Sequence, residues 1–184
     1  MEGKTHDGEI YIDELLQSKG LLTPKRWCKD PLLNTIIQRY YDICRAHAVN
    51  FSADIRLNST EFLQPMDVVA IFGNLLDNAS SAASMCEDGY VEIDCRVDEK
   101  KHESHIQIIN TCSQDPVSDG KGQWSTTKQD KGKHGYGLKS VENAITHYNG
   151  FLKTFYQQND KTFHVFIILH IITGGGSYSE YCDM

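Results

Sequence analysis

Apolar residues recur with the spacing of an α-helix in four stretches of the chain. These stretches are 9–20, 31–49, 65–84 and 136–148. Asp30 followed by Pro31 predicts the start of the second helix, because Asp caps a helix and Pro is accepted in the first turn. Gly20 and Gly150 end the first and the last stretch. We therefore expect three well-formed helices, preceded by a shorter one near the N-terminus.

Five other stretches have the pattern of β-strands. They are 50–57, 90–99, 105–112, 151–157 and 162–171. The charged hairpin "EKKHES" makes the second and third strands antiparallel neighbours, and the polar turn "QND" joins the last two. Between Ser113 and Gly135 a polar segment rich in Gly, Lys, Ser and Thr is longer than an ordinary connection, which is typical of a lid or binding loop. Helices together with a mostly antiparallel sheet predict an α+β fold, a two-layer sandwich.

The helix predicted at 65–84 has two contrasting faces, since each residue turns an ideal helix by about 100°. One face is an apolar stripe of Val69, Phe72, Leu76, Ala79 and Ala83. The opposite face carries Asn74, Asp77, Asn78 and Ser81. The stripe is expected to pack on the sheet, which leaves the two asparagines pointing away from the core.

Two asparagines one turn apart admit two interpretations. They can belong to a solvated polar face, although Glu, Lys or Gln would form a better helix there. Alternatively, their amide oxygens can serve as ligands of a hard cation such as Mg²⁺, which completes its octahedron with water and phosphate oxygens. The second interpretation requires a phosphate site nearby.

The start of the last predicted helix offers such a site. Glycines at 132, 135 and 137 allow the backbone to approach a phosphate, and the helix N-terminus favours an anion. The preceding segment has a small excess of positive charge, with Lys121, Lys128, Lys131 and Lys133 against Asp119 and Asp130. Thr126 and Thr127 add hydroxyl groups beside Lys128. The alternative is a basic surface loop that binds no phosphate.

Composition narrows the class of protein. The chain has 184 residues, 40% of them hydrophobic, and a net charge of −7, which argues against a general nucleic-acid binder. Its six cysteines show neither a C-x-x-C pair nor zinc-finger spacing, so we expect reduced thiols in a cytosolic protein. The sequence has no pattern of a signal peptide, and its longest apolar run, 163–172, is about half of a membrane-spanning helix.

Taken together and in this order, the motifs resemble the GHKL superfamily of ATP-binding domains. "GNLLDNA" at 73–79 resembles the N box, and "WSTTKQDKGKHGYGLKSV" at 124–141 resembles the lid with its G2 box. "IIN", which ends at Asn110, stands where the G1 box begins. The resemblance covers 31–172 and is greatest to sensor histidine kinases of the peptide-quorum-sensing type in Gram-positive bacteria. It implies a Bergerat-type fold, with helices on one face of a mixed, mostly antiparallel sheet.

The resemblance also implies a nucleotide site that binds ATP and Mg²⁺. Asn78 would be the principal Mg²⁺ ligand and Asn74 a second, and Asn110 would accept a hydrogen bond from adenine. Phosphate contacts would come from Thr127, Lys128, His134, Gly135, Gly137 and Leu138. Two departures stand out. Asn74 occupies the position where DNA gyrase and MutL have a glutamate that activates water, and Cys112 stands where the G1 box has glycine.

The expected function is that of the catalytic domain of a two-component sensor histidine kinase. Residues 1–30 would be the end of a dimerisation helix with its linker, 31–172 the ATP-binding domain and 173–184 a flexible tail. The phosphoacceptor histidine would belong to an upstream helix that this chain begins too late to include. Expected partners are that helix, a response regulator, and a second copy within a membrane-anchored homodimer whose cytoplasmic portion this is. Two alternatives are a non-catalytic nucleotide-binding or interaction module and an anti-sigma-factor-type serine kinase.

Overall fold

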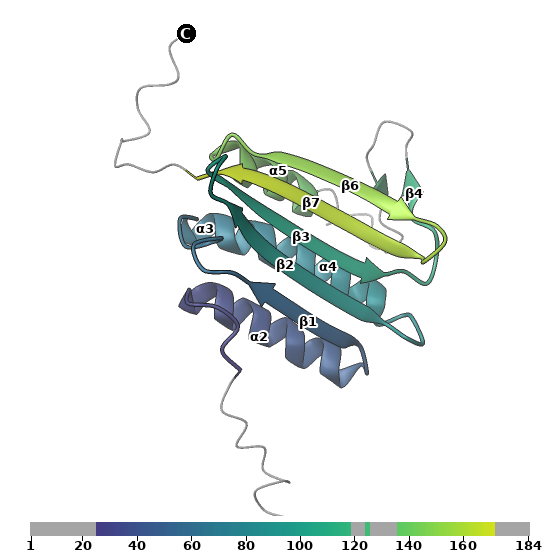
Figure 1. Cartoon of the computed structure of the whole chain (residues 1–184). Helices are drawn as coiled ribbons and strands as arrows, with labels where there is room; N and C mark the ends of the chain where they lie inside the picture. Colours follow the sequence, from purple (N-terminus) through teal and green to yellow (C-terminus); the bar gives the residue numbers. More distant parts are fainter. Residues whose placement is uncertain (1–24, 119–123, 126–135, 172–184) are drawn as a thin grey trace, which may run out of the picture.

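A five-stranded sheet covered by helices on one face forms the framework of the protein. The computed structural model describes residues 25–118, 124–125 and 136–171 (Figure 1). The helical elements are α2 (Pro31–Ala46), α3 (Pro65–Val68), the π-helical turn η1 (Val69–Gly73), α4 (Asn74–Ala83) and α5 (Tyr136–Thr146). The strands are β1 (Asn50–Ile55), β2 (Tyr90–Asp98), β3 (Glu103–Thr111), β4 (Val117–Ser118), β5 (Trp124–Ser125), β6 (Phe151–Gln157) and β7 (Thr162–His170).

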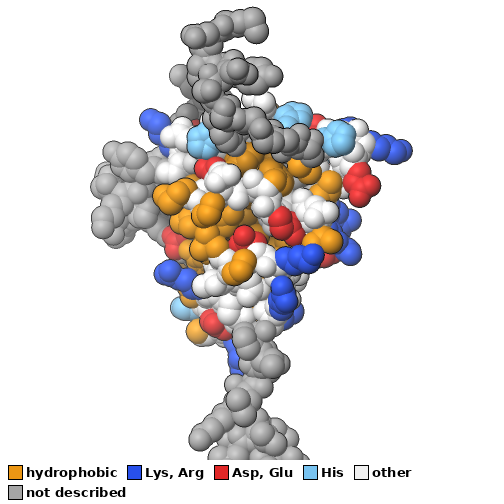
Figure 2. Space-filling model, turned by 90° about the vertical axis from the view of Figure 1, so that its left-hand side faces the viewer, with side chains coloured by type: hydrophobic (Ala, Val, Ile, Leu, Met, Phe, Trp, Pro, Cys, Tyr) orange, Lys and Arg blue, Asp and Glu red, His pale blue; other side chains and the backbone are white. Residues whose placement is uncertain are grey.

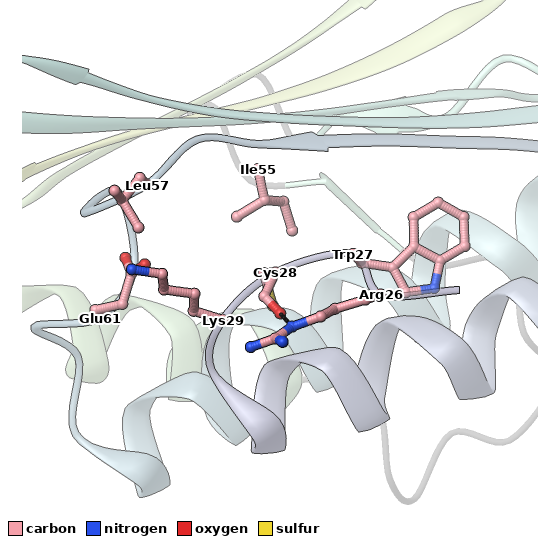
Figure 3. Close-up of a pocket in the computed structure, with 7 residues that line it drawn as sticks. All are labelled: Arg26, Trp27, Cys28, Lys29, Ile55, Leu57 and Glu61. Carbon is pink, nitrogen blue, oxygen red and sulfur yellow. Dashed lines mark hydrogen bonds between the residues drawn. The ribbon is translucent and has the colours of Figure 1, made fainter. Parts of the chain in front are cut away.

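The sheet has the order β1-β2-β3-β7-β6 and is mixed. Strands β2, β3, β7 and β6 are antiparallel neighbours; the two predicted hairpins account for β2–β3 and β6–β7, and the pairing of β3 with β7 joins them. Strand β1 pairs with β2 in parallel, because the chain passes through α3, η1 and α4 between them and returns in the same direction. The α+β two-layer sandwich predicted from the sequence is confirmed, with the helices gathered on one side of the sheet (Figures 1 and 3).

Helix α2 begins as its sequence predicts. The side chain of Asp30 accepts a hydrogen bond from the backbone N–H of Leu33 at 2.6 Å, and Pro31 occupies the first turn. Trp27, which precedes the predicted domain boundary, is 7% exposed and packs against the rings of Tyr41 and Phe51. The segment before α2 therefore contributes to the core.

The predicted helix at 65–84 is interrupted by a π-helical turn. Because this turn spans one more residue than an α-helical turn, it shifts the register between α3 and α4. Phe72, Leu76, Ala79 and Ala83 are buried as predicted, but Val69 is 46% exposed. Placing Val69 on the buried stripe was therefore wrong, because the prediction assumed an uninterrupted α-helix.

Two further findings concern the ends and loops of the fold. The polar segment 113–135 contains a short antiparallel pair, β4 with β5, which the sequence pattern did not predict. The predicted N-terminal helix at 9–20 and the tail at 173–184 lie outside the described residues.

At the end of the molecule that holds α3, hydrophobic side chains gather on the surface, and Leu57 and Met66 are 54% and 78% exposed (Figure 2).

Candidate functional site

Asn74 stands at the junction between the π-helical turn and α4, and its side chain is oriented by that junction. Its backbone N–H bonds to the carbonyl of Ile71. Its side-chain Nδ2 donates to the carbonyl of Ala70 at 2.6 Å. Since the amide nitrogen is used on the helix backbone, the amide oxygen Oδ1 is the end of the side chain left to accept a hydrogen bond or to bind a ligand.

The start of α5 lies directly against this amide. A Cβ atom placed on Gly137 would be 3.1 Å from Oδ1 of Asn74, closer than ordinary van der Waals contact. The two predicted motifs, far apart in sequence, thus meet at this point. A side chain at residue 137 would occupy the space beside the amide oxygen, so the glycine keeps that oxygen accessible.

Asn78 lies one turn further along α4 and is exposed, as is Asp77. The opposite side of α4 packs over β3, where Leu76 and Ala79 are 0% and 2% exposed. The predicted orientation of the polar face, away from the sheet, is what the structure has. A neutral amide oxygen with a free approach is a ligand that Mg²⁺ accepts.

A residue that the sequence did not single out supports this face from below. Tyr40 on α2 is 7% exposed, and its hydroxyl donates to the carbonyl of Gly73 at 3.0 Å. Burial, followed by the negative charge of Asp77, raises the pKa of Tyr40 above its ordinary value of 10.0. The hydroxyl therefore remains a donor at physiological pH. The sequence around Tyr40 does not indicate this hydrogen bond, because the residue fits the pattern of an ordinary core position in an amphipathic helix.

Asn110 occupies the last part of β3 on the face that the helices cover. It is 4% exposed and follows Ile106 and Ile108 on the same face. Its Nδ2 donates to the carbonyl of Thr111 at 2.9 Å and approaches Sγ of Cys112 at 3.5 Å. An aspartate could not make these contacts, because a carboxylate has no hydrogen to donate. The asparagine here thus matches its immediate surroundings.

Cys112 follows the end of β3 and is half-buried. Burial, then the neighbouring thiol of Cys86, raises the pKa of Cys112, so the thiol is protonated at neutral pH. Among the residues that the structure describes, Cys28, Cys44, Cys86, Cys95 and Cys112 are all free. Cys182 lies outside the described part.

Leu138, next to Gly137, is half-buried and packs against the hydrophobic core. Its contact with a phosphate, implied by the family resemblance, stays a prediction. The same holds for Thr127, Lys128, His134 and Gly135, which lie outside the described residues.

Two surface hollows lie away from this region. One, of about 250 Å³, is formed by the segment before α2 and the end of β1, and it includes Trp27, Cys28 and Leu57 (Figure 3). The other, of about 380 Å³, lies on the uncovered face of the sheet beside Asp94 and Phe166. Neither is lined by a residue predicted to contact nucleotide. None of the helices in the described ranges is both long and apolar enough to cross a membrane.

The comparisons with known proteins agree on the fold. The catalytic domain of the histidine kinase ThkA superposes with a TM-score of 0.57 at 15% identity, over 76% of this chain and 89% of that one. The mycobacterial sensor histidine kinase MprB gives 0.55 at 14% identity, over 74% and 94%. The histidine kinase AdeS of Acinetobacter baumannii gives 0.54 at 14% identity, over 88% and 78%. At this identity the likeness establishes the fold alone.

No curated protein sequence matches the chain. A family model described as "GHKL domain", however, matches residues 63–170, which is more than half of the chain. This range contains the asparagine helix, the end of β3 and the start of α5. The chain therefore belongs to the GHKL domain family.

Proposed function

We propose that this chain is the ATP-binding catalytic domain of a sensor histidine kinase. The observation that carries the proposal is the meeting of Asn74 with Gly137. It brings an amide oxygen to the start of a helix, where backbone N–H groups are available to an anion. A cation held by the amides and a phosphate held by the helix start would be neighbours there.

Asn78 and Asn74 are the residues that would hold Mg²⁺. The fit rests on the orientation of Asn74, whose Nδ2 is occupied by the carbonyl of Ala70, and on the exposure of Asn78. When bound, the metal neutralises phosphate charge during transfer of the γ-phosphoryl group. Thr127, Lys128, His134, Gly135, Gly137 and Leu138 are proposed to contact the phosphates.

The residue at position 74 favours transfer over hydrolysis. An amide cannot take a proton from water as a carboxylate can, so Asn74 is no general base. We therefore propose that the γ-phosphoryl group passes to a histidine imidazole of an upstream dimerisation helix, with ADP as the leaving group. A P–N bond forms as the P–O bond to ADP breaks. The response regulator would then receive the group, within a membrane-anchored homodimer of the Gram-positive quorum-sensing type that has this domain in the cytoplasm.

Asn110 is the proposed adenine contact. Its Nδ2 is engaged by Thr111 and Cys112, which leaves its carbonyl oxygen as the acceptor for the adenine amino group. A neutral acceptor forms a weaker bond than a carboxylate. We expect moderate selectivity for ATP over GTP.

Calorimetric titration with ATP and with GTP, each with and without Mg²⁺, tests the nucleotide site. We expect ATP to bind more tightly than GTP and Mg²⁺ to strengthen ATP binding. The Asn78→Ala variant should keep its fold, since Asn78 is exposed, and should lose the gain from Mg²⁺. Absence of binding under every condition would instead identify a module that acts by contact alone.

Phosphotransfer needs its own test. The domain is mixed with a separately produced acceptor helix of a cognate receptor and with γ-labelled ATP. Acid-labile label on the helix is the expected result. Acid-stable label on a copurifying protein would favour the serine-kinase alternative, and label that stays on ATP would contradict kinase activity.

A further inference from the structure

The π-helical turn before α4 is the structural feature that aims the asparagine face. Without it, Val69 and Phe72 would share the buried stripe, and every following residue would be rotated. With it, Val69 is 46% exposed while Phe72 is fully buried. The directions of Asn74 and Asn78 therefore depend on where this turn begins and ends.

A π-helical turn interrupts the regular ladder of α-helical backbone hydrogen bonds. Two side chains donate hydrogen bonds to carbonyl groups of this turn. Nδ2 of Asn74 donates a hydrogen bond to the carbonyl of Ala70 at 2.6 Å, and the hydroxyl of Tyr40 donates one to the carbonyl of Gly73 at 3.0 Å. The first partner is the proposed metal ligand itself. The second comes from another helix, α2.

We propose that Tyr40 is a positioning residue for the metal–phosphate site, acting through the carbonyl of Gly73. Gly73 is the last residue of the turn and directly precedes Asn74. The hydroxyl of Tyr40 fixes the peptide plane from which α4 starts, and so fixes the direction of Oδ1 of Asn74 toward Gly137. This inference rests on the proposed function of the asparagine face.

The surroundings of Tyr40 fit a positioning role. Its ring belongs to the hydrophobic core, and α2 packs against both η1 and α4. Gly73 itself has room, because the nearest atom to a Cβ there is Cγ1 of Val69 at 4.0 Å. The end of the turn therefore has room around the Cα of Gly73, and the hydrogen bond from the Tyr40 hydroxyl is a specific contact that holds its carbonyl.

The test is Tyr40→Phe, which removes the hydroxyl and keeps the ring. The matched control is Tyr41→Phe, the same exchange one residue later, where the ring packs against Trp27 and Phe51 instead. The loss of one hydrogen bond is small against the stability of a domain, so both variants are expected to fold. Thermal unfolding monitored by circular dichroism checks this.

Two measurements decide the proposal. The first is the side-chain amide signal of Asn74 in the NMR spectrum of the nucleotide-free protein, which we expect to shift in Tyr40→Phe and to stay unchanged in Tyr41→Phe. The second is calorimetry with ATP, in which we expect Tyr40→Phe to lose about fivefold of the affinity gained from Mg²⁺. Affinity for ATP without the metal should change little in either variant.

The outcomes separate this inference from the proposed function. If the wild-type protein gains nothing from Mg²⁺, the metal site is absent and the proposed function fails, whatever Tyr40 does. If the wild type gains affinity and Asn78→Ala loses that gain while Tyr40→Phe keeps it, the positioning role is overturned. An unshifted Asn74 amide signal in Tyr40→Phe would overturn it as well.

Discussion

Gly137 is the residue at which the two halves of the proposed site touch. A methyl group at this position would stand 3.1 Å from Oδ1 of Asn74, so the amide must move by a few tenths of an ångström. We expect Gly137→Ala to weaken Mg²⁺-dependent ATP binding about tenfold, measured by calorimetry. Its stability should hold, because Ala is a better helix former than Gly.

Gly73→Ala is the matched control for this substitution. It also places Ala in a helical segment, but its Cβ would have only Cγ1 of Val69 nearby, at 4.0 Å. We expect unchanged binding and a stability equal to or up to about 1 kcal/mol above that of the wild type. Equal losses of binding in both variants would show that the close approach at Gly137 is unimportant.

His164 on β7 should make the stability depend on pH. Burial lowers the pKa of His164 below its ordinary value of 6.5, with the charge of Asp160 opposing the shift, and the ring of Phe155 stacks on it at 4.5 Å. The unfolded chain therefore takes up a proton at a higher pH than the folded one. Stability should fall as the pH drops through 6.5 and level off below the folded pKa.

Urea unfolding between pH 5 and 8 measures this effect in wild type and in His164→Asn. In His164→Asn, we expect the free energy of unfolding to fall less at low pH than it does in the wild type. His102→Asn serves as the control, since His102 is exposed in the hairpin and its positive φ of 52° suits Asn. If His102→Asn removes as much of the decline as His164→Asn does, burial of His164 is not its cause.

At the scale of elements, α3 is tied to the end of α5 by a buried carboxylate. Asp67 is 6% exposed and accepts hydrogen bonds from the Tyr148 hydroxyl at 2.7 Å and from the imidazole of His147 at 3.1 Å. The same Tyr148 hydroxyl accepts from the backbone N–H of Gln64 at 2.8 Å. The hydroxyl oxygen of Tyr148 thus forms hydrogen bonds both at the start of α3 and in its first turn.

Tyr148→Phe removes that oxygen and leaves Asp67 and the Gln64 N–H without it. Because Asp67 is buried, we expect a loss of about 1–3 kcal/mol in the free energy of unfolding, measured with urea. Tyr156→Phe is the control, since it removes a Tyr–Asp hydrogen bond, to Asp115, at an exposed position. We expect no measurable change in the free energy of unfolding of Tyr156→Phe. If both variants lost a comparable amount of stability, burial of the hydrogen bond would not be what makes Tyr148 important.

Periodicity located most elements but not the break between them. Helix α2 and strands β2, β3, β6 and β7 follow from apolar spacing and turn residues, with ends within about three residues. The π-helical turn does not follow from the apolar spacing. Its sequence, "VVAIFG", is apolar at nearly every position, so the pattern does not indicate which residues face the core. The error at Val69 follows from that ambiguity.

For the site, the sequence indicated the residue types but not their contacts. The asparagine spacing and the glycines before α5 suggested metal and phosphate, and the resemblance joined them into one site. The proximity of Asn74 to Gly137 and the hydrogen bond from Tyr40 depend on how α2, α4 and α5 pack on the sheet. Such contacts between distant segments leave no periodic trace in one sequence.

At the scale of the whole molecule, the helix layer separates the site from the stabilising core. The inner side of α4 packs over β3, while its outer side carries Asn74 and Asn78. The exposed Asn78 can therefore be exchanged at little cost to the fold. A ligand bound on this outer side still stabilises the folded state, because the unfolded chain does not assemble α4 beside the start of α5.

ATP with Mg²⁺ should therefore raise the unfolding temperature of the wild-type protein. At a ligand concentration about 100 times Kd, the expected stabilisation is about 2.7 kcal/mol, which corresponds to a shift of several degrees. Differential scanning calorimetry measures it with ATP alone, with Mg²⁺ alone and with both. In Asn78→Ala, ATP with Mg²⁺ should shift the transition no more than ATP alone. An equal shift in variant and wild type would mean that Asn78 takes no part in holding the metal, and the Mg²⁺ ligand would then have to be sought elsewhere than on this turn of α4.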